Sequence, residues 1–522
     1  MAKPRKQGVL ALDIGTSSVR AVVYDIHGRM RPSTLFDVPY KVRTTEPGEV
    51  SSDPRELVTL IAQSIDGTLV AARKGKVEIL AAGVSCYWHS LMGLDRADRP
   101  TTELFTWADT RSALETRGLR ARFDEHAYHA RTGCFFHASY WPSKLLWLRA
   151  TRAAAVRRTV RWVSLGEYLF QQLLGEGPVS YSMASGTGLL DVNRCQWDKQ
   201  ALKLAGIDAT QLSRLTDWDH PLHSLRPAFA RRWPELRDIP WYLPVGDGGL
   251  ANVGAGAVSP RWVCATIGTS GAMRVVLDRD RITVPWGTFV YRLDRRRFVL
   301  GGALSEGGNV VRWFTDGLGP QNKKALKQAA ALIPPDSHGL TVLPFWAGER
   351  SPNWRGDARA AITGLSLGTQ PAQMLRASME AITYQLVTVA SAMQRVITRP
   401  ESVIATGGQL VHSPAWSQIL ADALNQRVIT SPEPEASSRG AALLVLHALG
   451  KLPRFWSTTP ARGRIFRPRA RVHPIYERAR RRQQDLYDLL FPKLAQPEHA
   501  PPNAAAGSGS RKKDLRSPAA RR

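Results

Sequence analysis

The chain has 522 residues, 43% of them hydrophobic, and a formal net charge of +27 at pH 7. This length predicts two or more globular domains, and no apolar stretch approaches the roughly 18 to 20 residues of a membrane span. About half of the excess charge lies between Lys451 and Arg522 without a nucleic-acid-binding motif, so nucleic acid is not the expected partner, although the basic tail leaves weak polyanion binding open.

The first half of the chain alternates predicted strands and helices. Apolar runs on both sides of a Gly-Thr-Ser turn predict a β-hairpin over 8–25. Asp53 followed by Pro54 is typical of a helix start, because Asp can cap the first turn and proline fits its first position. A buried strand is expected over 79–85, and the apolar spacing over 112–174 predicts mainly helices. The remaining expected elements are an extended segment over 33–42, a loop and strand over 180–192, and a helix over 197–204.

The second half begins at Gly246 and repeats this alternation. Its first strand ends at Ile267, before a second Gly-Thr-Ser turn and another apolar run. Alternating strands and helices in both halves place the fold in the α/β class. Beyond Pro492 the chain is rich in Ala, Pro, Gly, Ser and basic residues, which predicts a disordered tail. Further expected elements are strands over 298–303, 341–345 and 403–406, and helices over 310–315, over 371–397, and from Ser413 and Ala436.

The repeated turn is the clearest functional signal. Ile-Gly-Thr-Ser occurs at 14–17 and again at 267–270, each time after an apolar run. The tip of such a turn presents backbone N–H groups and two hydroxyls, which suit phosphate oxygens. One Gly-Thr-Ser turn is ordinary turn composition. Two copies on matching hairpins predict two related halves that hold one polyphosphate between them.

Two aspartates stand at predicted strand ends near these turns. Asp247 lies between Gly246 and Gly248, where exposed backbone lets a ligand approach closely. Phosphoryl transfer to an alcohol uses a carboxylate that orients the hydroxyl and takes its proton. Turn formation is the alternative role, and the duplicated turns favour catalysis. Asp13 would offer an oxygen ligand to Mg²⁺, or would only cap the first turn.

Other polar and glycine positions also follow predicted strands. Gly407 and Gly408 would let the backbone approach a flat ring or a phosphate. His89, Asp109 and Arg111 stand at two strand ends of the first half and could line a polyol or sugar-acid pocket. A structural ion pair between the last two is the alternative.

Taken together, these motifs resemble the FGGY family of carbohydrate kinases, over a span from about Val9 to about Leu490. Within that family the resemblance is nearest to gluconate kinases. The motifs that carry it are LALDIGTSSVRAVVYD, TWADTR, TGCFFHASYWPSKLLWLR, VGDGGLANVGAGAV, ATIGTSGAMRVV, GGALSEGGNVVRWF, LPFWAGERSPNW, ATGGQLVHSPAWSQILADAL and EASSRGAALLVLHALG.

The resemblance implies two actin-like (ribonuclease H-like) domains with an ATP and substrate cleft between them. The expected division is an N-terminal domain over 1–245, a C-terminal domain over 246–491 and a basic tail over 492–522. The family also implies ATP and Mg²⁺ as cosubstrate and cofactor. Carried over to this sequence, the expected roles are Asp247 as catalytic base, Asp13 as Mg²⁺ contact, Thr16, Ser17, Gly268, Thr269 and Ser270 as phosphate ligands, Gly407 and Gly408 as the adenosine motif, and His89, Asp109 and Arg111 as substrate contacts.

Two segments depart from the gluconate kinase pattern. Tyr87-Trp88 replaces Gln-Met, and Ser305-Glu306 replaces Asn-Asn. Both lie near the expected substrate or nucleotide, so they leave the acceptor open. Gluconate is the leading expectation. The alternatives are a pentulose such as xylulose, a polyol, and a sugar-sensing regulator that has lost catalysis and uses its basic tail to bind nucleic acid.

The four cysteines are scattered, with no CxxC pair and no metal-ligand spacing. The basic N-terminus is followed by an apolar stretch that Asp13 interrupts, which does not resemble a signal peptide. We therefore expect a reduced, cytoplasmic protein whose partners are a small sugar or sugar acid and ATP, with no membrane contact. A homodimer stays open.

Overall fold

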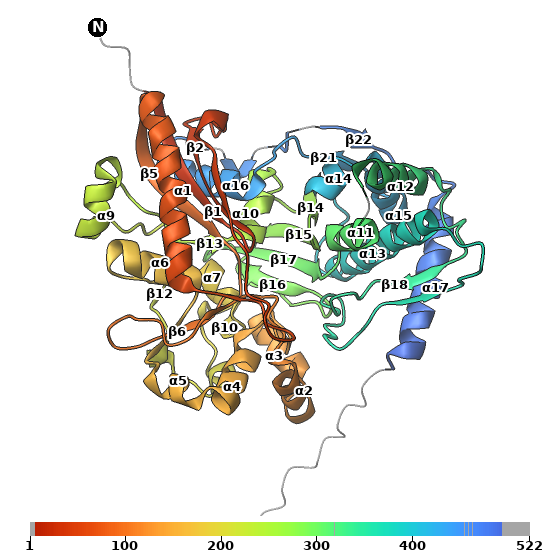
Figure 1. Ribbon diagram of the computed structural model, residues 1–522, viewed down its shortest axis with the longest axis horizontal. Coiled ribbons are helices and arrows are strands. Elements are labelled where there is room, and N and C mark those ends of the chain that lie inside the picture. Colours follow the sequence, from red (N-terminus) through yellow and green to blue (C-terminus); the bar gives the residue numbers. More distant parts are fainter. Residues whose placement is uncertain (1–5, 318, 454, 458, 462, 493–522) are drawn as a thin grey trace, which may run out of the picture.

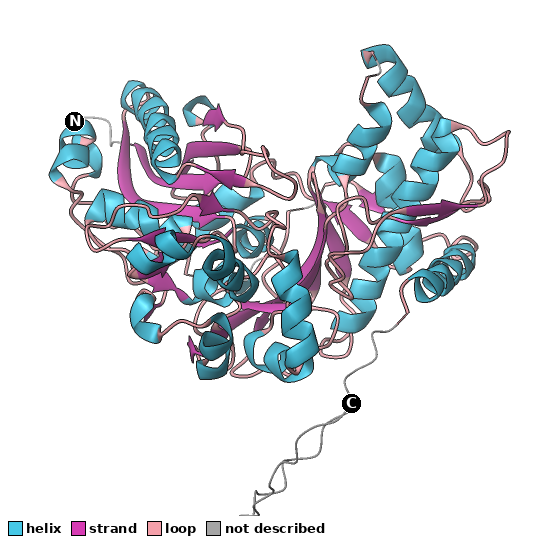
Figure 2. Cartoon of the chain, turned by 60° about the horizontal axis from the view of Figure 1, so that its bottom comes forward, coloured by secondary structure: helices cyan, strands magenta, loops and turns pink. Residues whose placement is uncertain are grey.

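Two β-sheets carry the fold, one in each half of the chain (Figure 1). The computed structural model describes residues 6–317, 319–453, 455–457, 459–461 and 463–492, so the predicted disordered tail lies outside the described residues from 493 onward. Helices surround both sheets (Figure 2), which confirms the α/β class. Among the described residues, no helix is both long enough and apolar enough to cross a membrane.

The first sheet has the hairpin of the N-terminus at its centre. Its strands in spatial order are β13 (Val245–Gly246), β5 (Val77–Cys86), β1 (Lys6–Ile14), β2 (Ser18–Asp25) and β3 (Phe36–Pro39). β1 pairs antiparallel with β2, as predicted, and parallel with β5. The segment of β1 from Gly8 to Leu12 is fully buried, because helices cover both faces of this sheet (Figure 1). The covering helices are α1 (Pro54–Lys74) and α16 (Ala436–Ala448).

The second sheet repeats the hairpin and extends it. Its strands in spatial order are β16 (Phe289–Arg292), β17 (Arg297–Leu304), β15 (Gly271–Asp278), β14 (Trp262–Ile267), β20 (Ser402–Thr406), β21 (Val428–Thr430) and β22 (Ile465–Phe466). β14 pairs antiparallel with β15 and parallel with β20. The helices of this half are α11 (Gly308–Thr315), α12 (Pro320–Leu332), α13 (Pro371–Met393), α14 (Gly408–Val411), α15 (Pro414–Leu424) and α17 (His473–Leu490), and a small hairpin is formed by β18 (Thr341–Leu343) and β19 (Ala361–Thr363).

The two halves are joined through a pair of packed helices. α10 (Asp247–Gly254) follows β13 of the first sheet and contacts β15 of the second. It packs along α16, which comes from the C-terminal part of the chain but lies against β1 and β5. Gly254 and Gly440 permit this contact, because a Cβ on Gly440 would overlap the backbone of Leu250 and one on Gly254 that of Ala436. The junction predicted near residue 246 therefore lies inside an interface to which both halves contribute.

A largely helical region is inserted in the first half after β5. Its helices are α2 (Ala113–Arg122), α3 (Glu125–Thr132), α4 (Trp141–Thr151), α5 (Ala153–Arg158), α6 (Leu165–Leu174), α7 (Tyr181–Ser185), α8 (Lys199–Ala205) and α9 (Pro227–Arg232). Short paired strands accompany them, namely β6 (Met92–Leu94), β7 (Leu104–Phe105), β8 (Arg161–Val163), β9 (Val179–Ser180), β10 (Leu190–Asp191), β11 (Gln196–Trp197) and β12 (Leu215–Thr216). The partner of β7 is β4 (Ser51–Ser52), which precedes α1 in the chain.

Most predicted elements are present, with local differences that have physical causes. Asp53 caps α1 by accepting hydrogen bonds from the N–H groups of Arg55 and Glu56. The segment predicted as loop and strand over 180–192 contains the short helix α7, because the Ser180 side chain accepts a hydrogen bond from the N–H of Met183 and so starts a helical turn. α8 begins two residues later than predicted, because Trp197 pairs in β11 and Asp198 supplies the cap.

Candidate active site

Both Gly-Thr-Ser turns open into one cavity of about 460 Å³. Thr16 and Ser17 line it from the β1–β2 turn, and the three residues of the second turn line it from the β14–β15 turn. Asp247 and His89 also line this cavity. Residues predicted from four separate places in the sequence therefore meet at a single site.

The backbone of the two turns is held by hydrogen bonds. In the first turn the N–H of Gly15 donates to the carbonyl of Ser18 over 3.0 Å, and the hydroxyl of Tyr40 donates to the Gly15 carbonyl over 2.7 Å. In the second turn the Gly268 carbonyl accepts from the N–H of Gly308 over 2.7 Å. This bond holds the N-terminus of α11 against the second turn, where a helix dipole favours an anion.

Asp247 begins α10 directly after the short strand β13. Its neighbours must be glycines, because a Cβ at Gly246 would overlap the indole of Trp88 and one at Gly248 would lie 2.8 Å from the same ring. Burial raises the pKa of the Asp247 carboxyl, while Arg274, the N–H of Gly248 and Arg350 act in the opposite direction. The result is a poorly solvated carboxyl group with two cations, Arg274 and Arg350, close enough to oppose the effect of burial.

Asp13 lies at the end of β1, below the first turn. Its Oδ1 accepts a hydrogen bond from the Ser85 hydroxyl over 2.7 Å, and Arg20 lies 3.9 Å from its Oδ2. Burial raises the pKa of this carboxyl to about 6, and the charge of Asp247 adds to the effect. Oδ2 of Asp13 is outside that hydrogen bond, and a carboxylate oxygen of this kind is a ligand that suits a hard divalent cation.

His89 is held in an uncommon backbone conformation on the wall of the same cavity. Its φ is 70°, which is rare for a residue other than glycine and marks a position fixed by its surroundings. Nδ1 contacts the carbonyl of Gly186, and since a carbonyl only accepts, this nitrogen carries the proton. Burial lowers the pKa of His89 to about 3, so the ring is neutral and its Nε2 is an acceptor. The edges of Tyr140 and Tyr291 pack around it.

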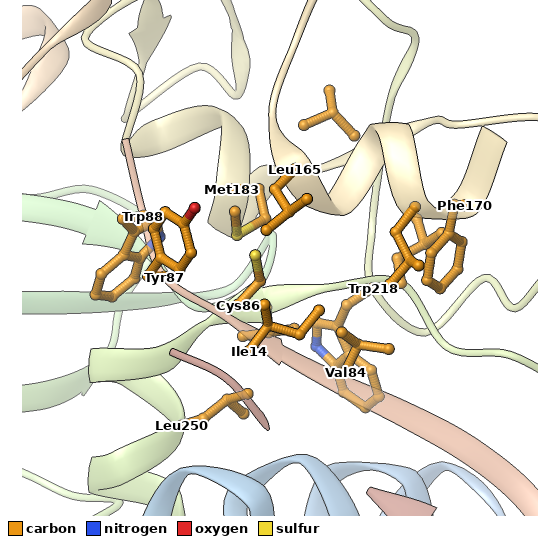
Figure 3. Close-up of a cluster of buried hydrophobic side chains, with 14 of the residues drawn as sticks. Ile14, Val84, Cys86, Tyr87, Trp88, Leu165, Phe170, Met183, Trp218 and Leu250 are labelled. Carbon is orange, nitrogen blue, oxygen red and sulfur yellow. The ribbon is translucent and has the colours of Figure 1, made fainter. Parts of the chain in front are cut away.

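The end of β5 supplies one wall of the site. Ile14, Val84 and Cys86 belong to the buried cluster, and Tyr87 and Trp88 follow at the strand end (Figure 3). Trp88 lines the cavity but is only 6% exposed, because its ring lies on the glycines around Asp247 and its Nε1 donates to the Ser182 carbonyl. The Tyr87 hydroxyl is buried without a partner among the described residues. This departure from the gluconate kinase pattern thus places an unsatisfied hydroxyl at the cavity wall.

Asp109 and Arg111 are not among the residues that line this cavity. They bind each other, with Arg111 Nη2 2.8 Å from Asp109 Oδ2, and the N–H of Val50 also donates to Asp109. Arg111 lies 3.6 Å from Glu103 and stacks on Trp147 at 4.8 Å. The structure thus shows the ion pair that the sequence left as the alternative, and it does not place these two side chains on the wall of this cavity.

Gly408 lies beyond the second turn, in adjoining cavities of about 420 and 890 Å³. The smaller one shares Gly268, Thr269 and Arg312 with the cavity that Asp247 lines, which we call the main cavity. A continuous path therefore leads from Asp247 past the second turn. Gly407 has a φ of 80°, and a Cβ there would lie 2.5 Å from the carbonyl of Ile267. The glycine pair therefore allows the close backbone approach that the sequence predicted.

Two buried arginines of the cavity were not predicted as site residues. Arg274 lies in the middle of β15 and Arg350 in the loop after β18. Their side chains are 8% and 9% exposed. Arg274 interrupts the apolar run of its strand, and this was the one sequence signal that could have revealed it.

The segment around Glu306 also departs from the gluconate kinase pattern, and here it has a structural role. Glu306 Oε1 accepts a hydrogen bond from the N–H of Ala347 over 3.0 Å, which joins the end of β17 to the loop of Arg350. Burial raises the pKa of Glu306 to about 8. The neighbouring Glu349 accepts from the hydroxyl of Tyr487, and burial raises its pKa to about 7.

A separate cluster of Asp336, His338 and Glu380 has groups close enough to hold a cation. Arg376 lies 2.5 Å from Glu380, and Arg482 lies 2.6 Å from Asp336. These two guanidinium groups already neutralise both carboxylates. The cluster is therefore a buried ion-pair network that ties α13 to α17.

Comparison with protein families and known proteins finds relatives over most of the chain. Residues 8–254 match the N-terminal domain of the FGGY family of carbohydrate kinases, and residues 263–449 match its C-terminal domain. A gluconokinase of Bacillus subtilis is 29% identical over 470 residues, covering 88% of this chain and 91% of that protein. A glycerol kinase of Stenotrophomonas maltophilia is also 29% identical, over 91% of this chain and 95% of that protein.

Solved structures show the same relationship. The crystal structure of a gluconate kinase from Lactobacillus acidophilus has a TM-score of 0.85 and 25% identity, covering 93% of this chain and 98% of that one. A ligand-bound xylulose kinase from the same organism has a TM-score of 0.86 and 25% identity, with coverage of 93% and 99%. The chain is a sugar kinase and belongs to the FGGY family of carbohydrate kinases.

Proposed function

We propose that the protein phosphorylates a sugar acid, with D-gluconate converted to 6-phosphogluconate at the expense of ATP. The observation that carries this proposal is that Asp247 lines the same cavity as both Gly-Thr-Ser turns. A carboxylate between the phosphate ligands and the acceptor pocket is what transfer to an alcohol requires. The gluconokinases among its relatives support gluconate as the acceptor.

In this proposal Asp247 orients the acceptor hydroxyl and takes its proton as the bond to phosphorus forms. Its poorly solvated carboxylate is a stronger base than an exposed one, because burial raises its pKa. The neutral His89 accepts a hydrogen bond at Nε2 from another hydroxyl of the sugar. The N–H groups and hydroxyls of the two turns bind phosphate oxygens from opposite sheets.

Asp13 would hold Mg²⁺ through Oδ2, which accepts no hydrogen bond from the described residues. Bound Mg²⁺ would neutralise charge on the phosphate oxygens. The path beyond the second turn, with Lys323 and Lys327 of α12 on its wall and Gly408 further along, would take the remaining phosphates and the nucleoside.

A pentulose is the second candidate acceptor. The ligand-bound xylulose kinase is structurally as similar to this chain as the gluconate kinase is. The four cysteines are free and buried, which is in keeping with a reducing compartment, and we propose a cytoplasmic location.

The test is ADP release by the purified protein with Mg-ATP and D-gluconate, D-xylulose or glycerol, together with mass spectrometry of the product. Gluconate should give the highest kcat/KM and a phosphorylated gluconate. A higher kcat/KM with xylulose would assign the chain to pentulose phosphorylation instead. If ATP is hydrolysed at the same rate whether or not any of these three compounds is present, none of them is the phosphoryl acceptor.

A further inference from the structure

Arg350 is a buried cation without a partner in the described part of the chain. Its side chain is 9% exposed, forms no ion pair or hydrogen bond with the described residues, and leaves Nε buried and unsatisfied. Its guanidinium instead faces the rings of Trp107 and Trp354, at 5.0 and 5.5 Å from their centroids. Aromatic faces attract a cation but do not accept hydrogen bonds from its five N–H groups. The guanidinium therefore gains hydrogen-bond partners only when a molecule with hydrogen-bond acceptors enters the cavity.

Arg274 is a second buried cation on the same wall, and only neutral oxygens hold it. Nη2 donates to the Thr266 hydroxyl over 3.0 Å and Nε to Asn252 Oδ1 over 3.4 Å. Among the described residues Arg274 forms no ion pair with a carboxylate within 4.0 Å, although its Nη1 lies 3.3 Å from the position that a Cβ at Gly248, next to Asp247, would occupy. The two hydrogen bonds to Thr266 and Asn252 fix the direction of the Arg274 guanidinium, but neither partner carries a charge that would neutralise it.

The two arginines line the same cavity as Asp247 and His89, the two residues that the proposed function assigns to the acceptor. Arg350 acts electrostatically on His89, Asp247 and Arg274, so all four groups share one region. The phosphate side has ligands of its own in the two turns and in Arg312, which also lines the adjoining cavity with the lysines of α12. Of the charged residues that line the main cavity, Asp247 is the one acid against three arginines. With Arg312 assigned to the phosphates, Arg274 and Arg350 still stand against Asp247 alone, so the acceptor region has a surplus of fixed positive charge.

We propose that Arg274 and Arg350 bind the carboxylate of the acceptor and so select sugar acids over neutral sugars. This inference rests on the proposed kinase function and adds the residues that determine its substrate class. A guanidinium matches a carboxylate in shape and can donate two parallel hydrogen bonds to it. A neutral sugar of the same length leaves two buried cations unpaired, and a site built around a polar contact rejects the analogue that lacks it.

The experiment compares D-gluconate with D-glucitol, which has the same six-carbon chain and an alcohol in place of the carboxylate. The ratio of kcat/KM for the acid to that for the alcohol is measured for the wild type, Arg274→Gln and Arg350→Gln. Each variant should lower this ratio by at least about 10²-fold, on the scale of a lost polar contact to a charged group. Arg350→Lys, which keeps the charge but loses the planar fork, should give an intermediate ratio.

Arg312→Gln is the matched control on the phosphate side. It should raise the KM for ATP and leave the acid-to-alcohol ratio within about threefold of the wild type, a range that corresponds to less than a typical hydrogen bond. A second measurement needs no variant. The thermal unfolding midpoint of the wild type is measured without nucleotide, in the presence of gluconate or of glucitol, as a readout of binding. Gluconate should raise that midpoint more than glucitol does.

The outcomes separate the inference from the proposed function. If the wild type phosphorylates gluconate but both glutamine variants keep its acid-to-alcohol ratio and raise the KM for ATP, the arginines serve the phosphates and the inference is wrong. If the wild type phosphorylates a neutral sugar and neither binds nor phosphorylates any sugar acid, the proposed acceptor and the inference both fail.

Discussion

The indole of Trp88 lies directly on Gly246, in the space that a Cβ at that position would need. Gly246 ends β13, and the next residue is Asp247. The ring therefore fixes the path of the backbone that presents this carboxylate. Trp88 is itself held from the other side by the Ser182 carbonyl and by the ring of Tyr291, 4.8 Å away.

Gly246→Ala should destabilise the protein and reduce turnover, because the new methyl group displaces either the ring or the backbone at Asp247. Overpacking of this kind costs about 1–3 kcal/mol. The measurement is the free energy of unfolding in urea together with kcat. Gly268→Ala is the control for stability, since a Cβ there meets no atom within 4 Å. Equal stability of the two variants would show that Trp88 does not restrict this position.

Arg111→Leu should lower the free energy of unfolding and leave the KM for the acceptor unchanged in the folded fraction. Removing one partner of a buried ion pair leaves Asp109, which is 1% exposed, without its cation, and this costs about 3–5 kcal/mol. The double variant Asp109→Asn with Arg111→Leu should be less destabilised than the single one. A large rise in the KM for the acceptor, at unchanged stability, would instead support the substrate contact expected from the sequence.

The contribution of Glu306 to stability should fall as the pH rises from about 5 to 8. Burial raises its pKa from 4.5 to about 8, so the folded state holds a proton that the unfolded chain has already released. The contribution of Glu306 is complete below pH 4.5 and is lost as the pH rises through 8, with a limit of about 1.4 kcal/mol per pH unit for one proton. Unfolding in urea at pH 5 and 8 should show a smaller loss for Glu306→Gln than for the wild type. Parallel losses would contradict the assignment.

Acid should destabilise the protein through buried histidines, of which His129 is the clearest to test. Its Nε2 lies 2.7 Å from the carbonyl of Thr288, and burial lowers its pKa from 6.5 to about 4. The unfolded chain therefore takes up a proton below pH 6.5 that the folded state refuses, and stability is lost as the pH falls from 6.5 to 4. His129→Gln keeps a donor for the carbonyl but cannot titrate. Its unfolding free energy should change less than that of the wild type between pH 7 and 4.5, and an equal change would count against this role.

The sequence predicted the parts of the site that lie within short, ordered motifs. Both Gly-Thr-Ser turns and Asp247 belong to local strand–turn or strand–helix patterns, so their surroundings are visible a few residues away. Arg274 and Arg350 were missed because their significance depends on lacking a carboxylate partner, and this is visible only when the whole cavity is formed. Arg111, in contrast, was expected to contact the substrate. Its partners Glu103 and Trp147 come from other segments and bind its guanidinium away from the cavity, which the local motif does not reveal.

The central claim is that Asp247 is the base for phosphoryl transfer, and the most direct test is single-variant kinetics with Mg-ATP and D-gluconate. Asp247→Asn preserves the shape of the side chain and removes its ability to take a proton. We expect kcat to fall by at least about 10²-fold, on the scale of a lost general base, while ATP binding measured by calorimetry is largely kept. Turnover close to that of the wild type, with ATP binding intact, would remove Asp247 from the mechanism.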